Sequence, residues 1–343
     1  MERYPFHARN WAVLAQALVA ARGARGASEA ALRLGLAGVA AWGWRRDTCA
    51  PLPRDTVVIV GHQRSGTTWL HRMMAAHPEA HALPFHALLL ASDTWQRRFQ
   101  RERPAWLDRF QERLMADMDP IHRIRLQEPE EDEFALWPLV RSPTCTWDRP
   151  WPPGMAPDID ADATSFAYYA QVVARSVRRT GRRYVGKNPH FTHRMEEVRA
   201  ALPGVRFVLL VRHPEEAIAS RLSLIRAIWR FRIPGFSELE PHHVEQIYAT
   251  SVRAYSGGLD GADVTVRYED LVADPVGTVV SVHEALALGT PPRAYLEQLS
   301  ARMRTGAAVH RYGLDEFGLS VDRIRADLAP VYAHWGFGEP ERW

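Results

Sequence analysis

The stretch VVIVGHQRSGTTWL, residues Val57 to Leu70, decides the fold. Its four β-branched residues, Val57 to Val60, predict a short buried strand, because a continuous apolar run of this length is typical of a strand covered on both faces. Gly61 ends the run, and a helix is expected to begin near Gly66. The sequence therefore predicts a strand, a tight loop and a helix in direct succession.

The loop between Gly61 and Gly66 has the G-x-x-x-x-G spacing of phosphate-binding loops. Backbone N–H groups at the start of a helix bind anions of this kind. A nucleoside triphosphatase carries lysine where Thr67 stands, whereas the nearest cation here is Arg64, three residues earlier. The loop thus predicts a site for a phosphate-like group other than ATP, and a plain glycine turn is the structural alternative.

Apolar runs and helical segments alternate through the rest of the chain. Further strands are expected at 184–186, 206–211 and 264–268, with helices at 163–180, 192–202, after 214, and at 276–288. This alternation predicts an α/β fold, a P-loop-like doubly wound parallel sheet with helices on both faces. Ligands of such sheets bind at the carboxyl ends of the strands, where the motifs fall. The expected domains are an N-terminal helical extension, 1–52, and a main domain, 53–343.

The N-terminal extension holds two apolar runs, Trp11 to Ala21 and Leu34 to Trp44, both too short to span a bilayer. Arginines flank both runs, so residues 1–50 are expected either to lie on an anionic membrane surface or to pack on the main domain or in a homodimer interface. A signal peptide is the weaker interpretation, because Glu2 and Gln16 interrupt its pattern.

The charge and the cysteine content limit which partners and which cellular compartment the protein is expected to have. The 43 basic and 40 acidic residues give a net charge of +3, and no dense basic tract favours a nucleic-acid partner. Lys187 is the only lysine. Two cysteines, Cys49 and Cys145, favour a reducing compartment, so we expect a cytoplasmic protein, at the inner face of the membrane under the membrane interpretation. A disulfide between the two stays open.

Four motifs follow one another in order: Gln63 to Leu70, Lys187-Asn188-Pro189, Val211 to Pro214 with Ser220, and Val266 to Leu271. They resemble the signatures of the sulfotransferases that use 3'-phosphoadenosine 5'-phosphosulfate (PAPS), along roughly residues 55–335. The chain looks most similar to the bacterial branch related to tyrosylprotein sulfotransferases, in which some members carry an acidic segment like Pro129 to Phe134.

The resemblance implies a role for each motif residue. The donor's 5'-phosphosulfate is expected on the loop and the first turn of its helix, held by Arg64, Ser65, Gly66, Thr67, Thr68 and Trp69. Arg64 is expected to reach the sulfate, and Lys187 to assist the leaving phosphate. Arg212 and Ser220 are expected to bind the 3'-phosphate, with Arg311 as a further contact. PAPS is the co-substrate, and no metal is required.

The general base is left open between two candidates. His86 is the first, because an imidazole titrates near neutrality. Glu131 is the rival, together with Glu133, as base or as the group that orients the acceptor. His77, His81 and His86 invite a zinc interpretation, but carboxylate or cysteine ligands at complementary spacing are missing from the sequence.

We therefore expect a sulfotransferase that moves a sulfuryl group to an alcohol or phenol on a moderately apolar small-molecule or lipid acceptor. Tryptophans in the 95–151 region and in the N-terminal runs are compatible with an apolar acceptor channel. Two alternatives stay open: a P-loop kinase of unusual sequence, which would need ATP and magnesium, and a membrane-peripheral nucleotide-binding protein with weak catalysis.

Overall fold

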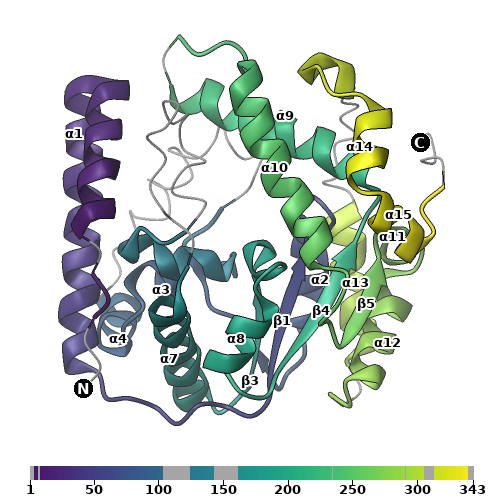
Figure 1. Ribbon diagram of the computed structural model, residues 1–343. Coiled ribbons are helices and arrows are strands. Elements are labelled where there is room, and N and C mark those ends of the chain that lie inside the picture. The colour runs from purple at the N-terminus through teal and green to yellow at the C-terminus, as the bar shows by residue number, and fades with distance from the viewer. Residues whose placement is uncertain are drawn as a thin grey trace.

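The computed structural model describes residues 4–6, 8–102, 124–142, 161–233, 235–289, 291–304 and 313–338. Its centre is a five-stranded sheet in the order β2-β3-β1-β4-β5, and every neighbouring pair is parallel (Figure 1). The strands are β1 (Thr56–Gly61), β2 (Ala80–His81), β3 (Arg183–Lys187), β4 (Val205–Val211) and β5 (Val264–Arg267). The predicted parallel α/β sheet is confirmed.

Strand β1 lies in the middle of the sheet and is buried along its whole length. Its side chains alternate between two cores, with Val58 and Val60 in one and Val57 and Ile59 in the other. This explains the unbroken apolar run, because a strand covered on both faces has no solvent side.

Helices cover both faces, as the doubly wound fold requires. The first core takes side chains from α3 (Phe85–Leu90), the 3₁₀ helix η1 (Asp132–Leu139), α7 (Ala163–Thr180) and α8 (Met195–Ala201). The second takes them from α2 (Thr67–Met74), α11 (Tyr268–Ala273), α12 (Pro275–Ala285) and α13 (Arg293–Arg304). The expected helices at 163–180, 192–202 and 276–288 correspond to α7, α8 and α12.

A third apolar cluster joins the helices of the C-terminal half. It combines α9 (Pro214–Arg232) and α10 (Pro241–Gly257) with η3 (Leu314–Phe317), α14 (Val321–Asp327) and α15 (Ala329–Trp335). These helices stand together on one side of the molecule, at the top and right in Figure 1. The short η2 (Pro189–Phe191) follows β3, and α4 (Asp93–Glu102) follows α3.

The N-terminal helical element α1 (Ala8–Arg46) spans both apolar runs but does not form a straight rod. A Cβ atom at Gly26 would lie 1.8 Å from the carbonyl oxygen of Leu18, although eight residues of straight helix would separate them by about 12 Å. Leu14 and Leu18 share a buried cluster with Ala37. The element therefore folds back between Leu18 and Gly26, and its two arms pack together at one edge of the molecule (Figure 1).

This N-terminal element contacts the main domain through α3, α4 and η1. Trp44 belongs to the first core, beside Tyr168 of α7. None of the described helices is long and apolar enough to cross a membrane.

Candidate active site

The phosphate-binding loop follows β1 at the carboxyl edge of the sheet. Gly66, with φ 91°, directly precedes α2, so this helix begins where the sequence predicts. Thr192 fixes the start of the loop, because its hydroxyl accepts a hydrogen bond from the N–H of Gly61 at 2.8 Å. The N–H of Asn188 donates to the carbonyl of Ile59 at 2.8 Å. The end of β3 is thereby tied to the strand that carries the loop.

Lys187 ends β3, and its side chain is completely buried. Its Nζ donates to Thr68 Oγ1 on α2 at 2.9 Å. The same atom lies 3.2 Å from Glu131 Oε1 and 3.4 Å from Glu130 Oε1. The lysine thus joins the phosphate-binding loop to the acidic segment.

Two opposing effects act on the Lys187 ammonium. Burial disfavours the charge, but the carboxylates of Glu131 and Glu130 outweigh it, so that the pKa of Lys187 is raised above its ordinary value. The side chain therefore carries a permanent positive charge in a site almost free of solvent.

Arg64, Arg212 and Ser220 meet on the other side of the loop. The Nε of Arg64 donates to Ser220 Oγ at 3.1 Å, and Nη1 of Arg212 donates to the carbonyl oxygen of Arg64 at 3.0 Å. Arg212 also pairs with Glu216 at 2.9 Å and lies 4.2 Å above the ring of Tyr268. Residues from three of the four motifs form this cluster, together with Glu216, which lies outside the motifs.

Asp132 anchors the acidic segment beneath β3. Its carboxyl group accepts hydrogen bonds from the hydroxyls of Tyr169 at 2.5 Å and Tyr184 at 2.6 Å. Any side chain at Gly186 would prevent this contact, since a Cβ there would lie 2.0 Å from Asp132 Oδ2. Burial raises the pKa of Asp132 to about 7, although the two tyrosine hydrogen bonds and Lys187 oppose the rise.

Glu133, two residues after Glu131, faces η2. Its Oε2 lies 2.7 Å from Nε2 of His190, and its other oxygen accepts from Ser142. The same His190 atom is 2.5 Å from Nε2 of Gln63 in the loop. Burial, together with Arg221 and other nearby cations, holds the pKa of His190 well below its ordinary range. The close contact therefore joins an imidazole whose pKa is lowered to a buried carboxyl group.

The structure brings together most of the predicted site residues. Arg64 to Trp69, Lys187, Arg212 and Ser220 lie on or around the loop, and Glu131 joins them through Lys187. His86 lies on α3, where its Nδ1 contacts the carbonyl oxygen of Leu126 at 2.7 Å and its ring stacks on Phe99 at 4.4 Å. Its catalytic role stays a prediction.

Arg311 and Cys145 lie outside the described residues, so the further donor contact and the disulfide also stay predictions. Cys49 is exposed. His77 stacks on His283 and His81 lies near Tyr184, apart from the neighbours of His86. Within the described ranges, the one group of three residues that could hold a metal is Glu240, His242 and His243 at the start of α10, remote in sequence from every motif.

Comparison with known families decides what this arrangement is. The model of the sulfotransferase family matches residues 56–292, which include the loop, Lys187, Arg212 and Ser220. The chain belongs to the sulfotransferase family. The sulfotransferase resemblance of the four motifs is thereby confirmed.

Curated relatives and solved structures agree with this assignment. The chain is similar to the omega-hydroxy-beta-dihydromenaquinone-9 sulfotransferase Stf3 of Mycobacterium bovis and of Mycobacterium tuberculosis. With each of them it shares 28% identity over 308 residues, which cover 82% of this chain and 73% of the relative. The crystal structure of sulfotransferase STF9 from Mycobacterium avium matches with a TM-score of 0.74 at 15% identity, covering both chains fully. STF1 from Mycobacterium tuberculosis matches with 0.71 at 19% identity, covering 94% of this chain and 92% of that one. These two structures support the fold.

Several residues around this sulfotransferase loop escaped the sequence analysis. Glu130 was visible only as one of four consecutive acidic residues, and nothing in the run shows which of them face Lys187. Arg221, which is buried, donates to Ser251 Oγ at 2.9 Å, and that hydroxyl also contacts His62 of the loop at 3.0 Å. The position of Arg221 beside Ser220 was the only available signal.

The raised pKa of Asp132 makes stability depend on pH. The unfolded group has a pKa of about 3.9, so the folded protein holds this proton more tightly. The resulting stabilisation is complete below about pH 4 and is lost as the pH rises through about 7. Relative to Asp132→Asn, which keeps the shape and cannot titrate, the wild-type free energy of unfolding should fall by about 1.4 kcal/mol per pH unit inside this window.

Urea unfolding of both proteins between pH 4 and pH 8 measures this difference. Asp260→Asn, the same change at an exposed position, is the control and should keep a constant difference from wild type. Parallel curves for Asp132→Asn and wild type would show that the pKa of Asp132 is the same in the folded and the unfolded protein, which would contradict the raised pKa.

Proposed function

We propose that the protein uses PAPS as sulfuryl donor and a hydroxyl group on an apolar small molecule or lipid as acceptor. The observation that carries this proposal is the position of Lys187, whose Nζ contacts Thr68 of the phosphate-binding loop at 2.9 Å. A buried permanent cation beside a loop of helix N-terminal N–H groups suits a leaving phosphate on which negative charge develops.

The donor's two phosphate groups fit the two sides of the loop. The 5'-phosphosulfate lies on the N–H groups of residues 65–68, between Lys187 and the guanidinium of Arg64. The 3'-phosphate binds Ser220 and Arg212. It competes there with Glu216, whose carboxylate lies 2.9 Å from the Arg212 guanidinium. Arginine suits this task, since its planar fork binds phosphate oxygens in pairs.

In the transfer step, the bond between sulfur and the phosphate oxygen breaks while a bond from sulfur to the acceptor oxygen forms. The phosphate leaves as 3',5'-adenosine bisphosphate, and Lys187 compensates its added charge. The acceptor's proton passes to a base, for which we infer Glu131. Its carboxylate lies 3.2 Å from Nζ of Lys187, whereas the contacts described for His86 lead to Leu126 and Phe99.

The name of the curated relative supports the acceptor class. The mycobacterial Stf3 enzymes are named for an omega-hydroxylated menaquinone, and the 28% identity covers most of both chains. An apolar acceptor that carries a hydroxyl group is accordingly the class we propose for this chain.

The donor is tested by thermal-shift titration with 3',5'-adenosine bisphosphate, AMP and ATP with magnesium. We expect the bisphosphate alone to raise the melting temperature, because a ligand of the folded state stabilises it by mass action. Arg212→Ala should weaken this binding by roughly 10- to 100-fold, the loss of one charge-assisted contact. Arg199→Ala, whose guanidinium pairs with Asp263 instead, is the control. A response to ATP with magnesium alone would favour the kinase alternative.

The base is tested by steady-state sulfation with two variants. Glu131→Gln should lower kcat by about 10²- to 10⁴-fold, since a general base contributes an effect of that size. His86→Gln should stay within a few-fold of wild type, as should the control Glu128→Gln, a nearby glutamate that pairs with Arg72. The opposite ranking of Glu131→Gln and His86→Gln would assign the base to His86.

We also propose that α1 rests on an anionic membrane surface, where a lipid acceptor is available. Four large apolar side chains of this element are exposed: Val19, Leu32, Leu34 and Trp42. Arg45 and Arg46 are exposed at its end, with the Arg46 guanidinium 4.0 Å from the Trp42 ring. Apolar side chains beside arginines suit the interface of anionic lipids.

Co-sedimentation with vesicles of phosphatidylcholine, with and without phosphatidylglycerol, tests the contact. The wild type should bind the anionic vesicles, and the double change Leu32→Asp and Leu34→Asp should abolish this binding. Leu52→Asp, at an exposed leucine beyond the helix, should leave it intact. Equal binding by wild type and double variant would contradict the membrane role. Dimers of the wild type that the double variant lacks would instead assign this face to a homodimer interface.

A further inference from the structure

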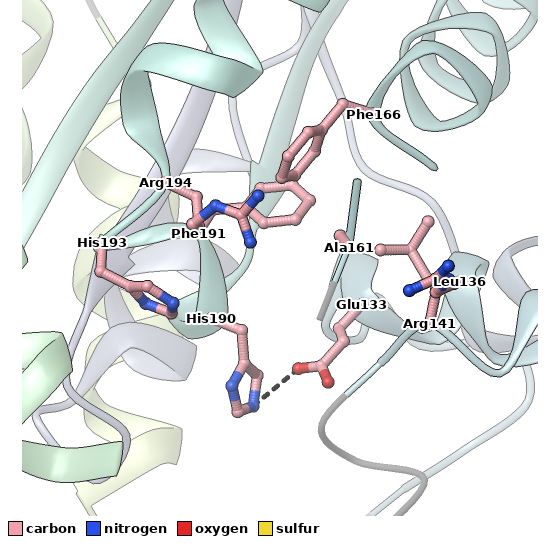
Figure 2. A pocket seen from close by; sticks show the side chains of 9 residues that line it. All are labelled: Glu133, Leu136, Arg141, Ala161, Phe166, His190, Phe191, His193 and Arg194. Atoms are coloured by element: carbon pink, nitrogen blue, oxygen red, sulfur yellow. Dashed lines mark ion pairs between the residues drawn. The ribbon is translucent and has the colours of Figure 1, made fainter. Parts of the chain in front are cut away.

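Two elements outside the four motifs hold the start of the phosphate-binding loop. On one side, Gln63 lies 2.5 Å from His190 of η2, and Figure 2 shows the contact of that histidine with Glu133. On the other side, the loop meets α10, because Nε2 of the buried His62 lies 3.0 Å from Ser251 Oγ. The first side chains of the loop are therefore fixed by η2 and by α10.

Tyr255 extends the contact between α10 and the loop to the end of β4. It stands one helical turn after Ser251 and is also buried. Its ring stacks on His62, with 4.9 Å between the ring centroids and 16° between the ring planes. Its hydroxyl donates to the carbonyl oxygen of Arg212 at 2.9 Å. One side chain thus contacts both the start of the loop and the residue on which we place the 3'-phosphate.

The Tyr255 hydroxyl is a lasting donor in this contact. Burial raises the pKa of Tyr255 far above its ordinary value, although the charge of Arg212 opposes the rise. The carbonyl group that accepts this hydrogen bond lies where the chain passes from β4 to α9. The contact therefore fixes the main chain from which the Arg212 side chain extends.

The Arg212 side chain leads from this anchored main chain back to the loop. Its Nη1 donates to the carbonyl oxygen of Arg64 at 3.0 Å, and the guanidinium also pairs with Glu216. Ordering a long side chain costs conformational entropy. A main chain that is already fixed lowers the cost of placing the guanidinium on a phosphate group.

We propose that Tyr255 is a positioning residue for the donor. It holds Arg212 at a fixed distance from the phosphate-binding loop, and this spacing favours a 3',5'-bisphosphorylated nucleotide over a 5'-monophosphate. The inference rests on the proposed function, in which the loop takes the 5' group and Arg212 takes the 3'-phosphate. It adds the residue that determines the spacing between these two groups.

The change Tyr255→Phe tests this role, since it keeps the ring on His62 and removes only the hydroxyl. Calorimetric titration measures the dissociation constants of 3',5'-adenosine bisphosphate and of AMP, which lacks the 3'-phosphate. The variant should bind the bisphosphate about three- to tenfold more weakly, the range for one neutral hydrogen bond. AMP should stay within about twofold of wild type, whereas a general loss of structure would weaken both nucleotides alike.

Tyr248→Phe is the matched control. Tyr248 lies on the same helix and is as buried as Tyr255, with exposed fractions of 2% and 3%, but its hydroxyl donates to Asp327 at 2.8 Å. This variant should bind both nucleotides as wild type does. Unchanged bisphosphate affinity in Tyr255→Phe, or an equal loss for both nucleotides, would overturn the inference and leave the proposed donor standing. A wild type that binds the bisphosphate no more tightly than AMP would instead overturn the proposed function.

Discussion

The buried ammonium of Lys187 is the constraint on which the site depends. Removing such a charge from water costs several kcal/mol unless hydrogen bonds and opposite charges offset the loss. Thr68, Glu130 and Glu131 supply these contacts, so the acidic segment has to lie directly against the end of β3. Asp132 holds it there through two tyrosine hydroxyls, and the missing side chain of Gly186 makes room for that carboxyl group.

Partners within the protein balance the charges around the loop. Lys187 faces two carboxylates, Arg212 faces Glu216, and Arg64 donates to the hydroxyl of Ser220. Under the proposed function, the donor's anionic groups replace these internal partners one by one. Binding therefore exchanges contacts within the protein for contacts with the donor, and it requires no cation to be newly buried. Glu131 is released from Lys187 in the same exchange and gains the freedom to accept a proton.

The sequence predicted the fold and the geometry of the loop between β1 and α2 well, because both depend on local patterns. The apolar run of β1, the glycine spacing and the residues that end β3 and β4 sit at the carboxyl edge of a parallel sheet, and that edge brings them together. The acidic segment was harder to interpret, because the sequence does not distinguish four adjacent carboxylates. Glu130 and Glu131 precede η1 and Asp132 and Glu133 begin it, so the change of backbone conformation directs the side chains to different partners. Glu131 turns toward Lys187, Asp132 toward Tyr169 and Tyr184, and Glu133 toward His190. The fold-back of α1 also depends on tertiary contact, since its alanine-rich sequence suits a continuous helix equally well.

Arg64 holds a backbone conformation that its side chain does not favour. Its φ of 70° lies in the left-handed region, which costs a non-glycine residue about 1–2 kcal/mol. The same conformation presents its carbonyl oxygen to Arg212 while its guanidinium reaches Ser220. Laboratory evolution for heat resistance alone would accordingly enrich Arg64→Gly, which relaxes the backbone and deletes the cation. Under the proposed function, a protein stabilised in this way would have lost a cation that we place beside the transferred sulfate, so selection for stability and selection for turnover would favour different residues at this position.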